Sequence, residues 1–192
     1  MNAMTTAPSP ARDRLLQTAS EIFYREGIHG IGVDRILADA QVTRATMYRH
    51  FPGKEALVVA YLSGEHERLQ RYFAAASADG SATAEQLLGA VVHGIADDVA
   101  TNHTRGCPFI NAAAEYPDAS SPVREVIAEH RGWFRATLRA VAADAGVGDP
   151  DGVADSLVLL RDAALVGGYL DGPEHVRESF VRTAGAVVGR EL

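Results

Sequence analysis

Apolar residues recur at helical spacing along almost the whole chain, and short segments rich in glycine, proline and polar residues separate one run from the next. A repeat of about 3.6 residues lines apolar side chains along one face of an α-helix. The β-branched runs are short and lie within alanine-rich helical sequence, which does not favour a sheet. The sequence therefore predicts an all-α protein of about nine helices, at residues 10–26, 33–40, 43–51, 54–77, 83–102, 106–116, 121–145, 150–170 and 173–189.

Charge is distributed unevenly along the chain. The 192 residues carry a formal net charge of −7. Residues 1–60 hold 7 Lys and Arg against 6 Asp and Glu, whereas residues 61–192 hold 11 against 19. The larger part therefore repels nucleic acid, and the smaller part is left to bind it.

Cysteine and histidine usage bounds the chemistry. Cys107 is the only cysteine, which excludes an intramolecular disulfide and a cysteine zinc site. His66, His93, His103 and His130 do not show metal-ligand spacing, so we expect no metal and no cofactor. The sequence has no long apolar run and no signal peptide, which predicts a cytoplasmic protein that does not enter the membrane.

Residues 42–54, with the sequence VTRATMYRHFPGK, predict a short cationic helix. Val42, Met47 and Phe51 fall on its buried side, and no acid lies between Ala40 and Lys54. Together with the helices predicted before it, this segment describes a helix-turn-helix unit, whose last helix can enter the major groove of DNA. The exposed side would present Arg44, Thr46, Tyr48, Arg49 and His50.

Residues 12–60 resemble the DNA-binding domain of the TetR/AcrR family of bacterial regulators. The resemblance rests on the pattern Thr-x-Tyr-x-His-Phe from Thr46 to Phe51 and on the Lys-Glu-x-Leu helix start at Lys54. It implies a homodimeric repressor that binds a palindromic double-stranded DNA operator and is released by a small-molecule effector. The implied domains are a flexible tail at 1–9, a helix-turn-helix domain at 10–53 and a ligand-binding and dimerisation domain at 54–192.

The resemblance also assigns contacts to DNA. It implies that bases face Thr43, Arg44, Ala45 and Thr46, that phosphates contact Tyr48, His50 and Lys54, and that Arg49 contacts either. The sequence departs from the family pattern in two places. Gln41 stands where the family usually has glycine, so we expect either a strained turn or a left-handed glutamine. Val33 and Asp34 open the second helix without the usual hydroxyl, so Asp34 should stay away from DNA.

The effector site is predicted less sharply. One interpretation places Phe109, Asn111 and Glu115 along a cavity, with Trp133, Phe134 and Tyr169 as further candidates. The alternative makes Cys107 and Phe109 core residues and Asn111 a partner of nearby backbone. Trp133 and Phe134 are adjacent on one helix, so one should be core and the other can reach the cavity. We expect an effector that is largely apolar with a polar handle.

The last two helices are candidates for the dimer interface. They carry small and apolar residues, including Leu159, Leu165, Val166, Gly167, Gly168 and Tyr169, followed by Val176, Phe180, Ala184 and Val187. The alternative is that these residues form the core of the chain.

Two other function classes remain open: an all-α enzyme or carrier that uses the C-terminal cavity, and a helix-turn-helix that serves only protein interaction. The enzyme class lacks a paired nucleophile and base, so we expect no enzyme activity.

Overall fold

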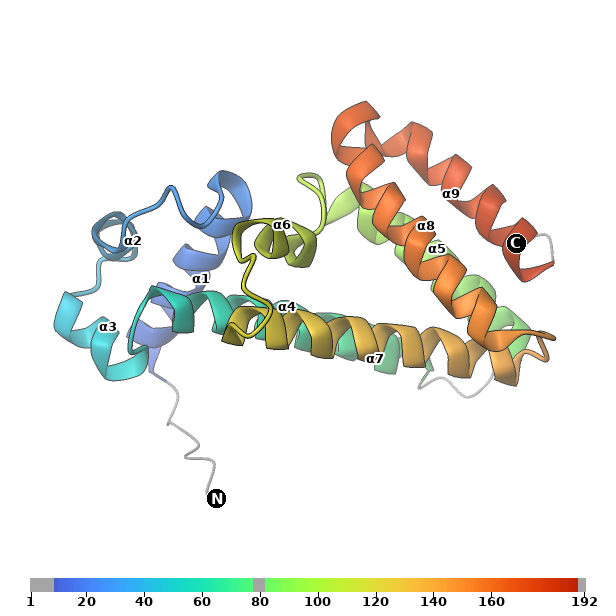
Figure 1. Cartoon of the computed structure of the whole chain (residues 1–192), viewed down its shortest axis with the longest axis horizontal. Coiled ribbons are helices and arrows are strands. Elements are labelled where there is room, and N and C mark those ends of the chain that lie inside the picture. Colours follow the sequence, from blue (N-terminus) through green and yellow to red (C-terminus); the bar gives the residue numbers. More distant parts are fainter. Residues whose placement is uncertain (1–8, 78–81, 190–192) are drawn as a thin grey trace, which may run out of the picture. The chain divides into compact units, whose positions relative to one another are not determined.

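The structure, a computed structural model, describes residues 9–77 and 82–189, which form nine α-helices and no strand (Figure 1). This confirms the all-α prediction. Most predicted boundaries agree within two residues. The helices are α1 (Pro10–Glu26), α2 (Val33–Ala40), α3 (Arg44–His50), α4 (Lys54–Ser77), α5 (Ala84–Thr101), α6 (Pro108–Glu115), α7 (Pro122–Asp144), α8 (Pro150–Asp171) and α9 (Pro173–Val188).

The chain packs as two compact units. The first contains Met1–Glu65 and Ala112–Val126, and the second contains His66–Asn111 and Ile127–Leu192. Helices α4, α6 and α7 each contribute residues to both units, so the packing units do not follow the division predicted at residue 53. Of the predicted tail at 1–9 only Ser9 is described, and the break predicted at Ala78-Asp79-Gly80 lies outside the described residues.

The first unit is built around the packing of α1, α2 and α3. Leu15, Ile36 and Met47 are fully buried, one from each of these helices. Helix α1 starts with Pro10 at its first turn, where the missing N–H costs nothing, and ends at Gly27, whose φ is 87°. Ser9 occupies the N-cap position but makes no capping hydrogen bond; its Oγ lies 3.4 Å from Nε2 of His50. Ser9 therefore tethers the end of α3 instead of the start of α1.

The turn between α2 and α3 depends on Gln41. Its φ of 52° and ψ of 47° place it in the left-handed region, and its N–H is directed to carbonyls of the last turn of α2. Left-handed backbone is costly for a residue with a Cβ, which is why glycine is preferred there. The structure confirms that Gln41 accepts this conformation.

The second unit packs α5, α8 and α9 together, with α8 and α9 side by side as an antiparallel pair (Figure 1). Leu165 on α8 is only 1% exposed, so it belongs to the core and not to a free interface. The adjacent glycines also serve packing within the chain. A Cβ on Gly168 would lie 3.2 Å from Val99 on α5, and one on Gly167 would lie 3.3 Å from Val176 on α9. Both glycines therefore allow close approach between helices of the same chain, and the dimer interface expected at the last two helices stays a prediction.

Two structural properties bear on function class. Among the described helices, none combines the length and apolar character needed to cross a membrane. In the described part of the chain, His, Cys, Asp and Glu side chains also do not gather in groups of three or more that could hold a metal ion.

Candidate DNA-binding surface and regulatory cavity

Helix α3 presents a polar face to solvent and buries its apolar face. Met47 is fully buried against α1 and α2, while Tyr48 is 50% exposed and Arg49 is exposed. Thr43 fixes the start of the helix, since its Oγ1 accepts the N–H of Thr46 at 3.2 Å. Thr43 is therefore the N-cap of α3. A short, capped helix with an exposed polar face has the form needed to enter the major groove.

Arg44 forms an ion pair with Asp34 in the protein without DNA. Its guanidinium hydrogen-bonds the carboxylate of Asp34, the second residue of α2, and both side chains are largely exposed. An exposed ion pair contributes little free energy, so Arg44 can exchange it for a base edge or a phosphate. The sequence predicted that Asp34 stays away from DNA, but it did not predict this pairing with Arg44.

Lys54 begins α4 and also secures the connector between α1 and α2. Its Nζ donates to the carbonyl of Ile31 at 2.5 Å. Partial burial lowers the pKa of the Lys54 ammonium, and the nearby charge of Glu115 opposes that shift. An ammonium has three N–H donors, so this bond leaves two for the phosphate contact, which stays a prediction.

Glu115, at the end of α6, hydrogen-bonds to the connector between α1 and α2 within the first unit. Its Oε1 accepts the N–H of Ile28 at 2.8 Å, and its Oε2 accepts the N–H of His29 at 2.5 Å. Oε2 also lies 3.4 Å from Nδ1 of His29, whose ring packs against Tyr116. A carboxylate satisfied by two backbone donors gives Glu115 a structural role that the sequence did not predict.

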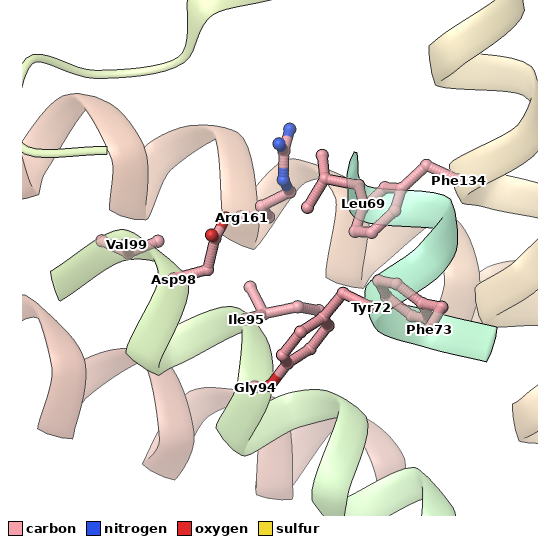
Figure 2. Close-up of a pocket in the computed structure, with 9 residues that line it drawn as sticks. All are labelled: Leu69, Tyr72, Phe73, Gly94, Ile95, Asp98, Val99, Phe134 and Arg161. Carbon is pink, nitrogen blue, oxygen red and sulfur yellow. The ribbon is translucent and has the colours of Figure 1, made fainter. Parts of the chain in front are cut away.

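The second unit encloses a small cavity between α4, α5, α7 and α8 (Figure 2). It measures about 20 Å³, enough for one water molecule. Apolar and aromatic side chains form most of its wall, with Asp98 and Arg161 as the charged members. The lining residues are Leu69, Tyr72, Phe73, Gly94, Ile95, Asp98, Val99, Phe134 and Arg161.

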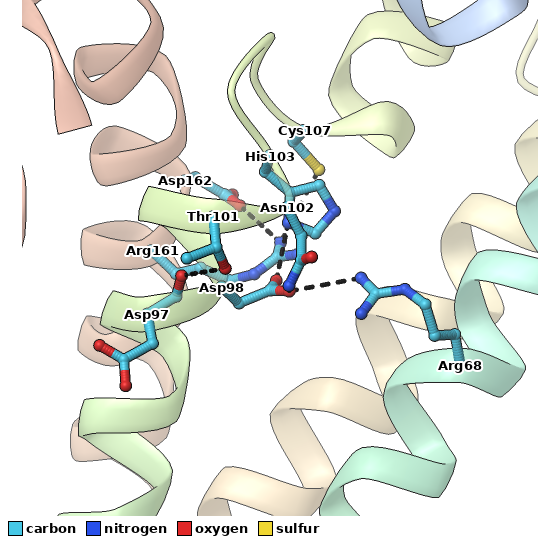
Figure 3. Close-up of polar contacts among 9 residues, drawn as sticks. All are labelled: Arg68, Asp97, Asp98, Thr101, Asn102, His103, Cys107, Arg161 and Asp162. Carbon is cyan, nitrogen blue, oxygen red and sulfur yellow. Dashed lines mark hydrogen bonds and ion pairs between the residues drawn. The ribbon is translucent and has the colours of Figure 1, made fainter. Parts of the chain in front are cut away.

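A polar network borders this cavity (Figure 3). The Asp98 carboxylate pairs with Nδ1 of His103 at 2.7 Å and with Arg68 at 3.4 Å, and it accepts from Asn102 at 3.0 Å. Burial alone raises the pKa of Asp98, but the hydrogen bond and charge of His103, with the charge of Arg68, outweigh it and lower that pKa. Asp98 is therefore an ionised and already partnered group.

A buried histidine pair lies in the same unit. The Nδ1 atoms of His66 and His130 are 3.3 Å apart, and the His130 ring stacks on Phe109 at 3.7 Å. Burial lowers the pKa of His130 to about 3, and the charge of Arg161 adds to the shift. His130 is therefore neutral, and the pair is a core element at ordinary pH.

Comparison with known proteins decides the family. Residues 15–61 match the model of bacterial regulatory proteins of the tetR family, and residues 84–149 match that of the tetracyclin repressor-like C-terminal domain. A crystal structure of a TetR-family transcriptional regulator from Streptomyces coelicolor is 45% identical, covers 93% of this chain and 94% of that chain, and superposes with a TM-score of 0.87. The chain belongs to the TetR family of transcriptional regulators.

Curated relatives in the TetR family are more distant or match over a shorter length. The transcriptional repressor DhaR of Mycobacterium sp. (strain GP1) is 26% identical over 167 residues, 83% of each protein. The regulator UidR of Escherichia coli (strain K12) is 37% identical over 68 residues, and the match spans 35% of each protein. The resemblance inferred from the recognition-helix motif is thereby confirmed at the level of the family.

The structure separates the predicted effector residues of this TetR-family protein. Phe134 lines the cavity, whereas Phe109 is buried against His130 and Asn111 donates to the carbonyl of Arg105 at 3.1 Å. Trp133 is half-buried against His66 and Phe73. Tyr169 is exposed under the guanidinium of Arg105. Phe109 is thus a core residue and Asn111 bonds to nearby backbone, as the alternative interpretation of the sequence expected. Ligand contact by these two residues stays a prediction.

Sequence reasoning missed most of the cavity wall. Leu69, Tyr72 and Phe73 share one side of α4, and Ile95, Asp98 and Val99 share one side of α5. The signal available was Asp98 within an apolar face, together with Arg161 on α8 between Val158 and Leu165. A charge on a buried helical face often marks a partner or a ligand.

Proposed function

We propose that this TetR-family regulator represses transcription as a homodimer that binds a palindromic operator through α3. Residues 10–53 would form the DNA-binding domain, and residues 54–192 the ligand-binding and dimerisation domain, in a cytoplasmic protein without enzyme activity. The observation that carries the proposal is the capped α3 helix, which buries Met47 and exposes a cationic polar face. The similarity to the transcriptional repressor DhaR supports repression.

The exposed side chains of α3 suit different parts of DNA. Arg44 can reach guanine O6 and N7 after leaving Asp34, and the methyl groups of Ala45 and Thr46 suit thymine. Tyr48 and Arg49 are exposed on the same short helix, and Thr43, His50 and Lys54 flank its ends. Phosphate contacts from Tyr48, His50 and Lys54 would fix the register. Base contacts from the start of the helix, including Thr43, would specify the sequence.

A dimer would present two such helices to the two halves of the operator. Helix α8 exposes four large apolar side chains, Leu159, Val166, Tyr169 and Leu170. Exposed apolar residues gathered on one helix favour a protein interface over free solvent. These residues replace Leu165 as the positions at which we expect partner contact.

An effector would act by preferring the conformation that no longer fits the operator. A ligand shifts such an equilibrium only by its differential affinity for the two conformations. The cavity bordered by α4, α5, α7 and α8 is the site we propose for it. It has apolar walls and few polar groups, as small-molecule sites do.

In vitro selection from genomic fragments, followed by footprinting, tests the proposal. We expect a two-fold symmetric protected site with half-sites about one helical turn, roughly 34 Å, apart. Arg44→Ala should bind the site more weakly and relax the base preference at one position, whereas Arg135→Ala on α7 should bind it as the wild type does. Recovery of no symmetric site by a folded, dimeric protein would contradict the proposal.

A further inference from the structure

Arg161 is a buried cation with unused hydrogen-bonding capacity. Its side chain is about 95% buried at the edge of the cavity in the second unit (relative exposure 5%). Nη1 lies 3.5 Å from the carboxylate of Asp162 and 3.8 Å from Sγ of Cys107. Nη2 is buried without a hydrogen-bond partner among the described residues. A buried N–H donor that lacks an acceptor costs free energy, and an acceptor bound there would recover it.

The carboxylates near Arg161 are engaged by other cations. Oδ2 of Asp162 accepts from Arg131 at 2.8 Å, while its Oδ1 lies 3.5 Å from Nη1 of Arg161 and is buried without a hydrogen-bond partner among the described residues. Asp98 is held by His103, Arg68 and Asn102. Counting Arg68, Arg131 and Arg161 against Asp98 and Asp162 leaves one net positive charge when His103 is neutral. The edge of the cavity therefore favours an anion over a cation.

The rest of the cavity suits a flat apolar body. The guanidinium of Arg161 lies 4.9 Å from the centroid of the Phe134 ring, and Phe73 packs edge-on to the same ring. Figure 2 shows Arg161 and Phe134 near one end of the cavity, with Tyr72 and Gly94 at the other. A molecule along this axis would place its charge at Arg161 and its apolar part against Phe73 and Tyr72.

We propose that the effector is a small organic acid, a carboxylate on a flat apolar body, whose carboxylate binds Nη2 of Arg161. This inference rests on the proposed effector-controlled function and names the ligand class of that site. A carboxylate forms both an ion pair and a hydrogen bond with a guanidinium. An amide of the same shape accepts the hydrogen bond without the ion pair, and a protonated amine is repelled.

Tyr72 is the wall that must move to admit such a molecule. About 20 Å³ holds only a water molecule, so the acid needs more space than the cavity has in this conformation. Tyr72 is half exposed, and its Oη would lie 2.8 Å from a Cβ on Gly94. The phenol therefore rests in the space left by the missing side chain of Gly94. Because Tyr72 belongs to α4, the helix that begins at Lys54, its displacement would link acid binding to a change in α4.

Calorimetry on the full-length protein tests the ligand class. The probes are benzoate, phenylacetate, 3-phenylpropionate and 1-naphthoate, each beside its amide and the corresponding primary amine. We expect at least one acid to bind about tenfold to a hundredfold more tightly than its amide, with the amine weaker still. Arg161→Met should remove this preference, and Arg139→Met, at an exposed arginine of α7, should retain it.

Gly94→Val provides a second variant that leaves Arg161 intact. Gly94 lines the cavity, so the added side chain takes up space that the apolar body needs even after Tyr72 has moved. We therefore expect acid binding to weaken by at least about tenfold, even if Arg161→Met does not fold. The proposal is overturned if no acid binds better than its amide, if folded Arg161→Met keeps the preference, or if Gly94→Val binds the acid as tightly as the wild type does. Operator titrations on the same samples keep the two proposals apart. Normal operator binding without acid binding refutes only the ligand class, whereas absence of operator binding refutes the regulator function.

Discussion

The buried His130 makes the stability of this protein sensitive to acid. The pKa of His130 falls from 6.5 to about 3 in the folded chain because the ring is buried and lies near Arg161, His66, Arg131 and His103. The folded state therefore binds fewer protons than the unfolded state between these two values. Stability is fully present above pH 6.5 and is lost as the pH falls toward 3.

The size of this effect follows from the two pKa values. At 1.36 kcal/mol for each pKa unit, lowering the pH from about 7.5 to about 5 removes about 2 kcal/mol of unfolding free energy through His130. The lowered pKa of Asp98 does not contribute in this range, because its stabilisation is lost only below the ordinary carboxyl pKa of 3.8. The change in unfolding free energy between these two pH values is therefore expected to come mainly from His130.

Urea denaturation followed by circular dichroism at the two pH values measures the effect at constant protein concentration. His130→Phe keeps the stacking on Phe109 and removes the titrating group, so its pH dependence should be smaller than that of the wild type by about 2 kcal/mol. His175→Gln, at an exposed histidine of α9, should behave like the wild type. Equal pH dependence in wild type and His130→Phe would refute the argument that burial keeps His130 neutral.

Three further predictions concern the first unit and the interface. Asp34→Asn frees Arg44 and removes a negative charge, so DNA affinity in fluorescence anisotropy should rise several-fold at low salt, and an unchanged affinity would count against the ion pair. Leu170→Glu should give a folded monomer by light scattering and circular dichroism, whereas Leu165→Glu should lose the native spectrum; a Leu170→Glu dimer would exclude that position from the interface. Glu115→Gln leaves the N–H of Ile28 or of His29 without an acceptor, so urea denaturation should show an unfolding free energy lower by about 1–3 kcal/mol. An unchanged unfolding free energy would mean that these two hydrogen bonds do not stabilise the protein.

The sequence predicted the helices and the recognition motif because both depend on local pattern. Helical spacing, Pro10 and Gly27 set α1, and the Thr43 cap set α3, without any long-range contact. Leu159 and Leu165 show the limit of this reasoning. Both are apolar residues of α8, yet one is 69% exposed and the other 1%, because only the packing of α5 and α9 against α8 decides which side is covered.

The cavity and the hydrogen bonds of Glu115 could not be predicted from local sequence patterns, because both join residues that are distant in sequence. Asp98 and Arg161 are far apart in sequence and line the same cavity only because α5 and α8 pack together. Glu115 reaches Ile28 across 87 positions, a pairing that no spacing rule predicts. The family resemblance assigned the DNA contacts by position, and it carried no information about effector residues.

The central claim is that α3 reads a DNA sequence, and one titration tests it most directly. Fluorescence anisotropy compares the selected operator with a scrambled duplex of equal length at the same salt concentration. We expect the wild type to prefer the operator by about a thousandfold or more, and Arg44→Ala to narrow that preference by about 1–3 kcal/mol. Equal affinity of the folded, dimeric wild type for both duplexes would contradict the account.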